Sequence, residues 1–105
     1  MILNMSFKTI GATEALKAFT EEKSRKLEKY FRGRISVTWN FDVNREDQIA
    51  HCHLVGNHMD YFVEAKTSDL YASIEQAVER LEKQLKKHKE IVKDHLHRHH
   101  HVRAG

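Results

Sequence analysis

Cationic side chains at helical spacing are the residues of this sequence with the clearest chemistry. At about 100° per residue, Arg80, Lys83 and Lys87 share one face of a predicted helix. A second strip, in an earlier predicted helix, consists of Arg25, Lys29 and Arg32, with Lys26 at its edge. Lysine and arginine neutralise phosphates without reading bases. The strips therefore predict binding to the backbone of a folded RNA, although such strips are also typical of solvated helix surfaces.

Two other groups of residues could carry chemistry of a different kind. Five histidines between residues 95 and 101 could bind zinc, nickel or copper, which leaves a metal-handling protein as the alternative function. These histidines lack a cysteine or carboxylate framework at the spacing of a structural site. A thiol enzyme built on Cys52 is a weaker alternative, because this cysteine lies at an inward strand position while His51 and His53 point to the opposite face. No catalytic residue, resident metal or cofactor is predicted.

Length, composition and charge indicate the general class of the protein. The chain has 105 residues, enough for one domain, and a single cysteine, which fits a reducing compartment. It shows no signal peptide and no apolar run long enough to cross a membrane, so we expect a cytoplasmic protein. The net charge is +3 for residues 13–34, −4 for residues 35–69 and +3 for residues 70–105. Such polarisation is typical of a protein that binds a polyanion along one face.

Two predicted helices must position the cationic strips. The second helix spans residues 69–93, and Thr67-Ser68-Asp69 supply capping side chains at its start. It carries glutamates on one flank. Its core-facing stripe consists of Leu70, Ile74, Ala77, Val78, Leu81 and Leu85. The first helix is capped by Thr13 and ends at Arg32-Gly33. Its apolar face consists of Leu16, Phe19, Thr20, Leu27, Tyr30 and Phe31. Lys23 lies within that face, so its ammonium group must extend to the rim of the core.

Four predicted strands complete the domain. Residues 2–8, 34–44, 48–56 and 61–66 alternate between apolar and polar side chains, which indicates a sheet with one buried and one wet face. The order β-α-β-β-β-α predicts an α+β fold, with a four-stranded mixed sheet and two parallel helices packed on one face. We expect one RNA-binding domain over residues 1–93 and a disordered, basic, histidine-rich tail over residues 94–105.

Two motifs on the predicted helices resemble a known family. The sequence Asp69-Leu-Tyr-Ala-Ser-Ile, followed by Leu81-x-x-Gln84-Leu85-x-Lys87-His88-Lys89, closely resembles the last helix of the ribosome hibernation promoting factor and ribosome-associated inhibitor family. The earlier Thr13-Glu-Ala-Leu-x-x-Phe19, with Lys23, Lys26-Leu27-Glu28 and Tyr30-Phe31, is similar to the first helix of that family. The resemblance extends from about residue 2 to residue 93, and the two motifs agree with the family in order and spacing.

The resemblance implies a domain that lodges in the small (30S) ribosomal subunit against 16S rRNA. There it would occupy the channel used by messenger RNA and the anticodon ends of transfer RNA, block translation and favour inactive, dimeric ribosomes. The chain matches the basic pattern of the family at Lys23, Lys26, Arg80, Lys83 and Lys87.

The ends of the chain suggest which form of the family it resembles. The sequence lacks the second, dimer-forming domain of the long form and the acidic extension of the inhibitor subtype, so the short form is expected. Ribosome pairing would then need a separate ribosome modulation factor. The free protein is expected to be a monomer without membrane contacts.

Overall fold

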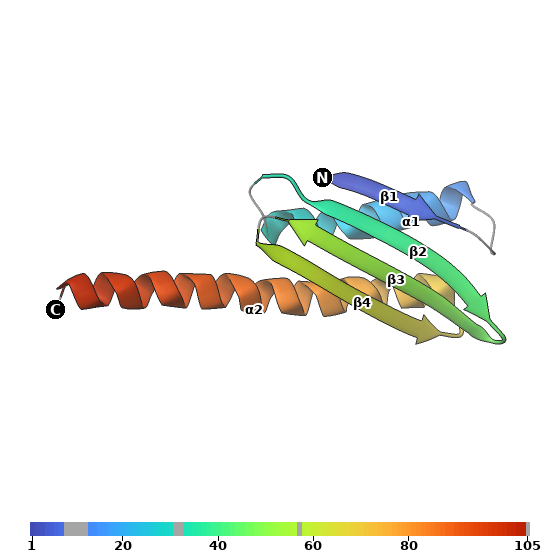
Figure 1. Ribbon diagram of the computed structural model, residues 1–105. Helices are drawn as coiled ribbons and strands as arrows, with labels where there is room; N and C mark the ends of the chain where they lie inside the picture. The colour runs from blue at the N-terminus through green and yellow to red at the C-terminus, as the bar shows by residue number, and fades with distance from the viewer. Residues whose placement is uncertain (8–12, 31–32, 57, 105) are drawn as a thin grey trace.

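A computed structural model describes residues 1–7, 13–30, 33–56 and 58–104, with side chains described as far as residue 87. The elements are β1 (Ile2–Ser6), α1 (Glu14–Arg25), the 3-10 helix η1 (Lys26–Tyr30), β2 (Ser36–Asn44), β3 (Asp47–Gly56), β4 (Met59–Thr67) and α2 (Leu70–Ala104). Figure 1 shows that α1 and α2 run in the same direction and cover one face of the sheet. The predicted α+β fold is confirmed.

The sheet has the strand order β1-β2-β3-β4. β1 pairs with β2 in parallel, whereas β2, β3 and β4 form an antiparallel meander. Asn44 pairs with Asp47, so a two-residue loop joins β2 to β3, and Arg45 in that loop has a φ of 60°. Gly33, just before β2, has a φ of 103°, a left-handed conformation that glycine adopts without steric cost.

The core lies between the sheet and the two helices. Strand alternation buries Val37, Trp39, Cys52 and Leu54 on the face that meets the helices. The predicted stripe of α2 is also buried, and consists of Leu70, Ile74, Ala77, Val78, Leu81 and Leu85. Leu3 and Met5 of β1 are only partly buried against this core, because β1 is short and lies at the edge of the sheet. The strand parities and the helix stripe predicted from the sequence are therefore confirmed.

Both helices differ from the prediction in how they continue. The first predicted helix changes to 3-10 geometry at Lys26, a common way for an α-helix to tighten at its end. Its predicted last turn includes residues 31 and 32, which lie outside the described residues. The second helix continues to Ala104, through the segment for which a disordered tail was predicted. No helix in the described part of the chain combines the length and the apolar character needed to cross a membrane.

Candidate nucleic-acid interface

Lys23 extends to the rim of the core, as its position in the apolar face of α1 predicted. Its side chain is 20% exposed, and its Nζ lies 3.3 Å from Oε1 of Glu75 on α2. The same ammonium group lies 5.3 Å from the centre of the Phe19 ring. The methylenes of Lys23 therefore follow the apolar face, while its charge is held between an aromatic ring and a carboxylate of the neighbouring helix.

Glu82 of α2 binds two side chains of η1. It accepts a hydrogen bond of 3.0 Å from the Tyr30 hydroxyl, and Nζ of Lys29 lies 3.5 Å from its Oε2. Partial burial raises the pKa of Tyr30, and the hydrogen bond to Glu82 raises it further. The sequence placed Lys29 on the far side of the first helix with Arg25. The tighter 3-10 turn rotates each residue by about 20° more than an α-helix does, and Lys29 therefore reaches α2.

These contacts form what we call the charged seam between the helices. Its members are Lys23, Lys26 and Lys29 on one side and Glu75, Glu79 and Glu82 on the other. Lys26 and Glu79 line a small cavity of about 120 Å³ within it. The glutamates that the sequence placed on one flank of α2 thus face the lysines of the first helix. Because opposite charges alternate across the seam, it is less positive than the lysine pattern alone suggests.

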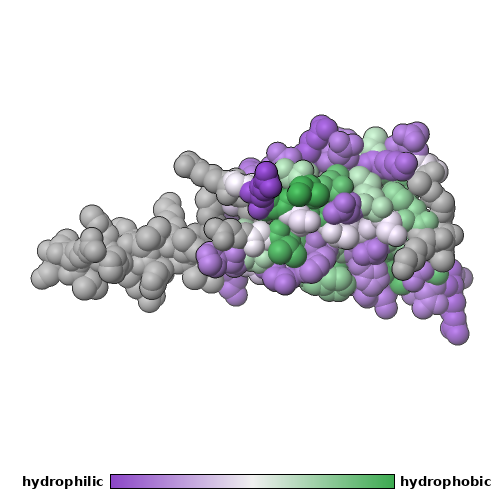
Figure 2. All heavy atoms as spheres, turned by 45° about the horizontal axis from the view of Figure 1, so that its top comes forward, coloured by the Kyte–Doolittle hydropathy of each residue, from purple (hydrophilic) through white to green (hydrophobic). Residues whose placement is uncertain are grey.

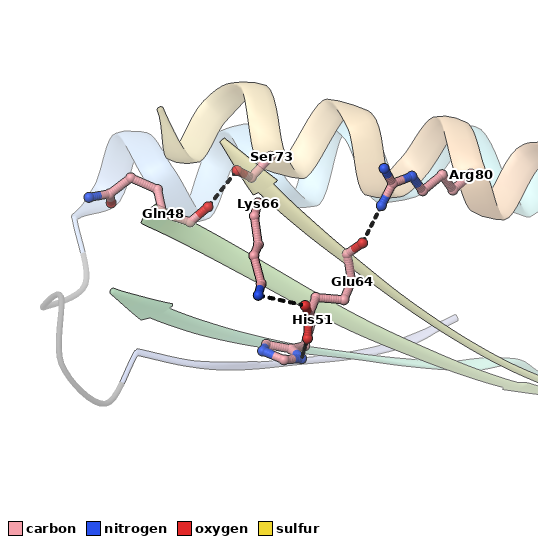
Figure 3. Close-up of polar contacts among 6 residues, drawn as sticks. All are labelled: Gln48, His51, Glu64, Lys66, Ser73 and Arg80. Atoms are coloured by element: carbon pink, nitrogen blue, oxygen red, sulfur yellow. Dashed lines mark hydrogen bonds and ion pairs between the residues drawn. The ribbon is translucent and has the colours of Figure 1, made fainter. Parts of the chain in front are cut away.

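The other flank of α2 carries the second cationic group. The Arg80 guanidinium donates a hydrogen bond to the backbone carbonyl of Glu64 on β4, as Figure 3 shows. Arg80 therefore covers part of the outer edge of the sheet and keeps only some of its donors for a ligand. Lys83 and Lys87 are exposed on the same helix. Within residues 1–7, 13–30, 33–56 and 58–87, no carboxylate pairs with Lys83 or Lys87.

The structure thus brings the predicted cations together on the helix layer but not in one continuous strip. Lys23, Lys26 and Lys29 belong to the charged seam, whereas Arg80, Lys83 and Lys87 lie on α2 beyond the glutamates. Arg25 pairs with Glu21 on its own helix at 3.3 Å, and Arg32 lies outside the described residues. The sequence could not show the seam. Helical spacing indicates which residues share a face of one helix, but not which face of the neighbouring helix lies next to them.

The alternative chemistries gain no support from the described residues. Cys52 is fully buried in the core, and burial raises the pKa of its thiol far above the ordinary range, so the thiolate needed for nucleophilic attack is suppressed. His51 and His53 lie on the opposite face of β3. No group of metal-ligating side chains is present among the residues whose side chains are described. The histidines of the predicted tail lie beyond them.

Comparison with known families gives one match over most of the chain. The family model described as "Sigma 54 modulation protein / S30EA ribosomal protein" matches residues 3–93. The ribosome hibernation promoting factors of Salmonella typhimurium and of Escherichia coli K12 are both 33% identical to this chain over 95 residues, which cover 90% of this chain and all of each relative. The resemblance identified in the sequence is confirmed.

Two solved structures have a similar fold. The N-terminal domain of Thermus thermophilus Protein Y is 26% identical, with a TM-score of 0.79 over 83% of this chain and 98% of that domain. A ribosomal subunit interface protein from Coxiella burnetii is 21% identical, with a TM-score of 0.75 over 86% of this chain and 99% of its own. The second comparison concerns the fold alone.

Proposed function

The chain belongs to the Sigma 54 modulation protein / S30EA ribosomal protein family, and from this membership we propose that it binds the small ribosomal subunit and inactivates the ribosome. Members of the family are ribosome hibernation and interface factors and not enzymes. The partner on the subunit is 16S rRNA, and the protein acts in the cytoplasm, where ribosomes are. Ribosome pairing, where it occurs, requires a modulation factor as a further partner.

Beside the family membership, the exposed cations of α2 are the structural observation that supports this proposal. Lys83 and Lys87 extend from the helix layer without a carboxylate partner among the described side chains. Arg80 lies beside them, and the lysines of the charged seam lie across the row of glutamates. RNA phosphates release bound counterions when such cations replace them, which makes binding favourable at low salt. Among the described side chains, Lys83 and Lys87 have no ion pair that must break before they make these contacts.

Inactivation by occupancy fits a protein with these features. Members of the family are not enzymes, and the described residues of this chain offer binding surfaces, namely the exposed cations of α2 and the lysines of the charged seam. A domain in the channel for messenger RNA and the anticodon ends of transfer RNA would exclude those ligands by volume. By linkage, each ligand must then weaken the equilibrium affinity of the other by the same factor.

We call the exposed side of α2 that carries Arg80, Lys83 and Lys87 the RNA-binding face. Charge reversal at two of these residues tests it. We expect the double substitution Lys83→Glu and Lys87→Glu to raise the dissociation constant for purified 30S subunits about ten-fold or more, with a shallower dependence on salt. Arg80 is left unchanged, so its contact with the carbonyl of Glu64 is kept. Co-sedimentation over a series of salt concentrations is the measurement. A dissociation constant equal to that of the wild type would contradict the assignment.

A matched control changes the same amount of charge elsewhere. Lys66→Glu combined with Arg45→Glu alters exposed residues on the sheet side and should leave 30S binding nearly unchanged.

Occlusion itself is tested by displacement of labelled protein from 30S subunits with initiator transfer RNA and messenger RNA. Chelator is present throughout, so that the histidine-rich tail cannot contribute through metal. Simultaneous binding of all ligands at full affinity would rule out occlusion.

A further inference from the structure

The face of the sheet opposite the helices carries exposed apolar side chains at one end. Phe62, Ile2 and Val55 are 58%, 55% and 41% exposed. The strand register places Ile2 and Val55 in one row across the sheet, with Ser36 between them, and Phe62 in the adjacent row. Figure 2 shows an apolar area over the sheet with hydrophilic side chains around it. The end of the sheet where β1 begins is therefore only partly polar.

Two histidines flank Phe62 on the neighbouring strand. Its ring centre lies 5.8 Å from that of His51 and 6.2 Å from that of His53. A carboxylate lies near each imidazole: His53 Nε2 is hydrogen-bonded to Oδ1 of Asp60 at 2.6 Å, and His51 Nδ1 is 3.5 Å from Oε2 of Glu64. Figure 3 shows that Glu64 also meets Lys66, at 3.7 Å. The rings are thus positioned side by side, and most of Phe62 faces solvent.

The charge of this face is opposite to that of the helix layer. Asp42, Asp60 and Glu64 carry carboxylates here, and Lys66 is the cation that the described strands place among them. These three carboxylates and one ammonium group sum to a charge of −2, so the face is acidic. Phosphates would meet repulsion from Asp60 and Glu64, so nucleic acid is a poor ligand for it. A second copy docking its helix layer here would form a head-to-tail contact that does not close, which favours filaments over a defined dimer.

We propose that this face binds a cationic segment of another protein, rich in arginine or lysine and containing an apolar side chain. A guanidinium or ammonium group would lie over the exposed ring of Phe62 while it pairs with Asp60 or Glu64. The apolar side chain would cover Val55 and Ile2, which water now contacts. The charge complementarity and the exposed ring carry this inference, and it does not depend on the RNA-binding face of α2.

The test uses the whole protein and synthetic probes. Isotope-labelled protein is titrated with a short peptide of arginine and serine that has a central leucine, and backbone amide shifts are followed by NMR. We expect shifts centred on Phe62, His53 and Val55, with weaker binding at high salt. Phe62→Ala should weaken binding about three-fold, and so should Asp60→Asn, which leaves the packing of Phe62 in place. Tyr71→Ala removes an exposed aromatic ring from the helix layer and should have no effect.

Each other outcome would overturn the proposal. Shifts of the same amides with oligouridylate, and not with the peptide, would make the face a platform for nucleobases. Shifts that grow with protein concentration alone would assign it to a second copy of the chain. Absence of any shift would leave the face without the proposed partner. Co-sedimentation of Phe62→Ala with 30S subunits is measured in parallel, and its full retention separates this surface from the RNA-binding face.

Discussion

Trp39 shows how one buried polar atom can depend on a partner from another element. Its side chain is fully buried, and its Nε1 donates a hydrogen bond of 2.9 Å to Oγ of Ser24 on α1. The Ser24 hydroxyl in turn donates to the carbonyl of Thr20 at 2.7 Å. Strand alternation predicted that Trp39 points inward. It gave no sign of Ser24, because alternation within one strand does not show which side chain of another element will accept the hydrogen bond.

Removal of that hydroxyl should destabilise the fold. Ser24→Ala leaves the buried indole N–H without an acceptor, which costs about 1–3 kcal/mol, less about 0.5 kcal/mol that alanine gains as a better helix former. Urea unfolding followed by tryptophan fluorescence measures the difference in the free energy of unfolding. Ser68→Ala changes an exposed serine and serves as the control. Equal stability of Ser24→Ala and wild type would show that the indole finds another acceptor.

At the scale of elements, periodicity predicted which side of each element is buried but not which side chains meet across elements. The stripe from Leu70 to Leu85 and the alternation in β2 are patterns within one segment, and both are confirmed. The charged seam depends on how two helices lie side by side. Glu75 and Glu82 could equally have faced water, and the change to 3-10 geometry at Lys26 moved Lys29 toward them.

The charged seam should limit how strongly the first helix attracts RNA. Glu75→Gln with Glu82→Gln frees Lys23 and Lys29 from their carboxylates, so we expect tighter 30S binding and a steeper salt dependence. Loss of these partly exposed pairs should cost only about 1 kcal/mol or less of stability. Glu14→Gln with Glu21→Gln removes two exposed pairs within α1 and is the matched control. Binding that is unchanged relative to this control would show that phosphates do not compete with the seam.

At the scale of the whole molecule, α2 determines the shape. The molecule measures 59 × 24 × 17 Å, and Figure 1 shows α2 continuing well past the sheet. A helix of 35 residues is about 50 Å long, whereas the core contacts of its described side chains end at Leu85. The sequence predicted this last buried position correctly. It could not fix where the helix ends, because the apolar stripe predicted from the sequence stops at Leu85 and helix propensity alone stabilises only marginally.

Removal of residues 94–105 separates the proposed function from the metal-handling alternative. The truncated protein should keep the melting temperature and the 30S binding of the full chain, because the core and the exposed lysines Lys83 and Lys87 are retained. Its affinity for zinc or nickel in a calorimetric titration should fall sharply, since five histidines are lost. Loss of ribosome binding on truncation, with chelator present, would contradict an RNA-binding face confined to residues 1–93.

The parallel pairing of β1 with β2 also has a kinetic consequence. β2, β3 and β4 are joined by short turns, so their contacts close small loops, whereas β1 must wait for α1 and η1 to be placed before it can join β2. Closing the longer loop costs more chain entropy. The five residues of β1 bury little apolar surface when the strand pairs with β2, so this cost is poorly compensated. The meander and α2 can therefore assemble first, with β1 docking last. In the native state β1 is then the strand that detaches most readily, and its amide hydrogens should exchange with solvent earliest in the sheet.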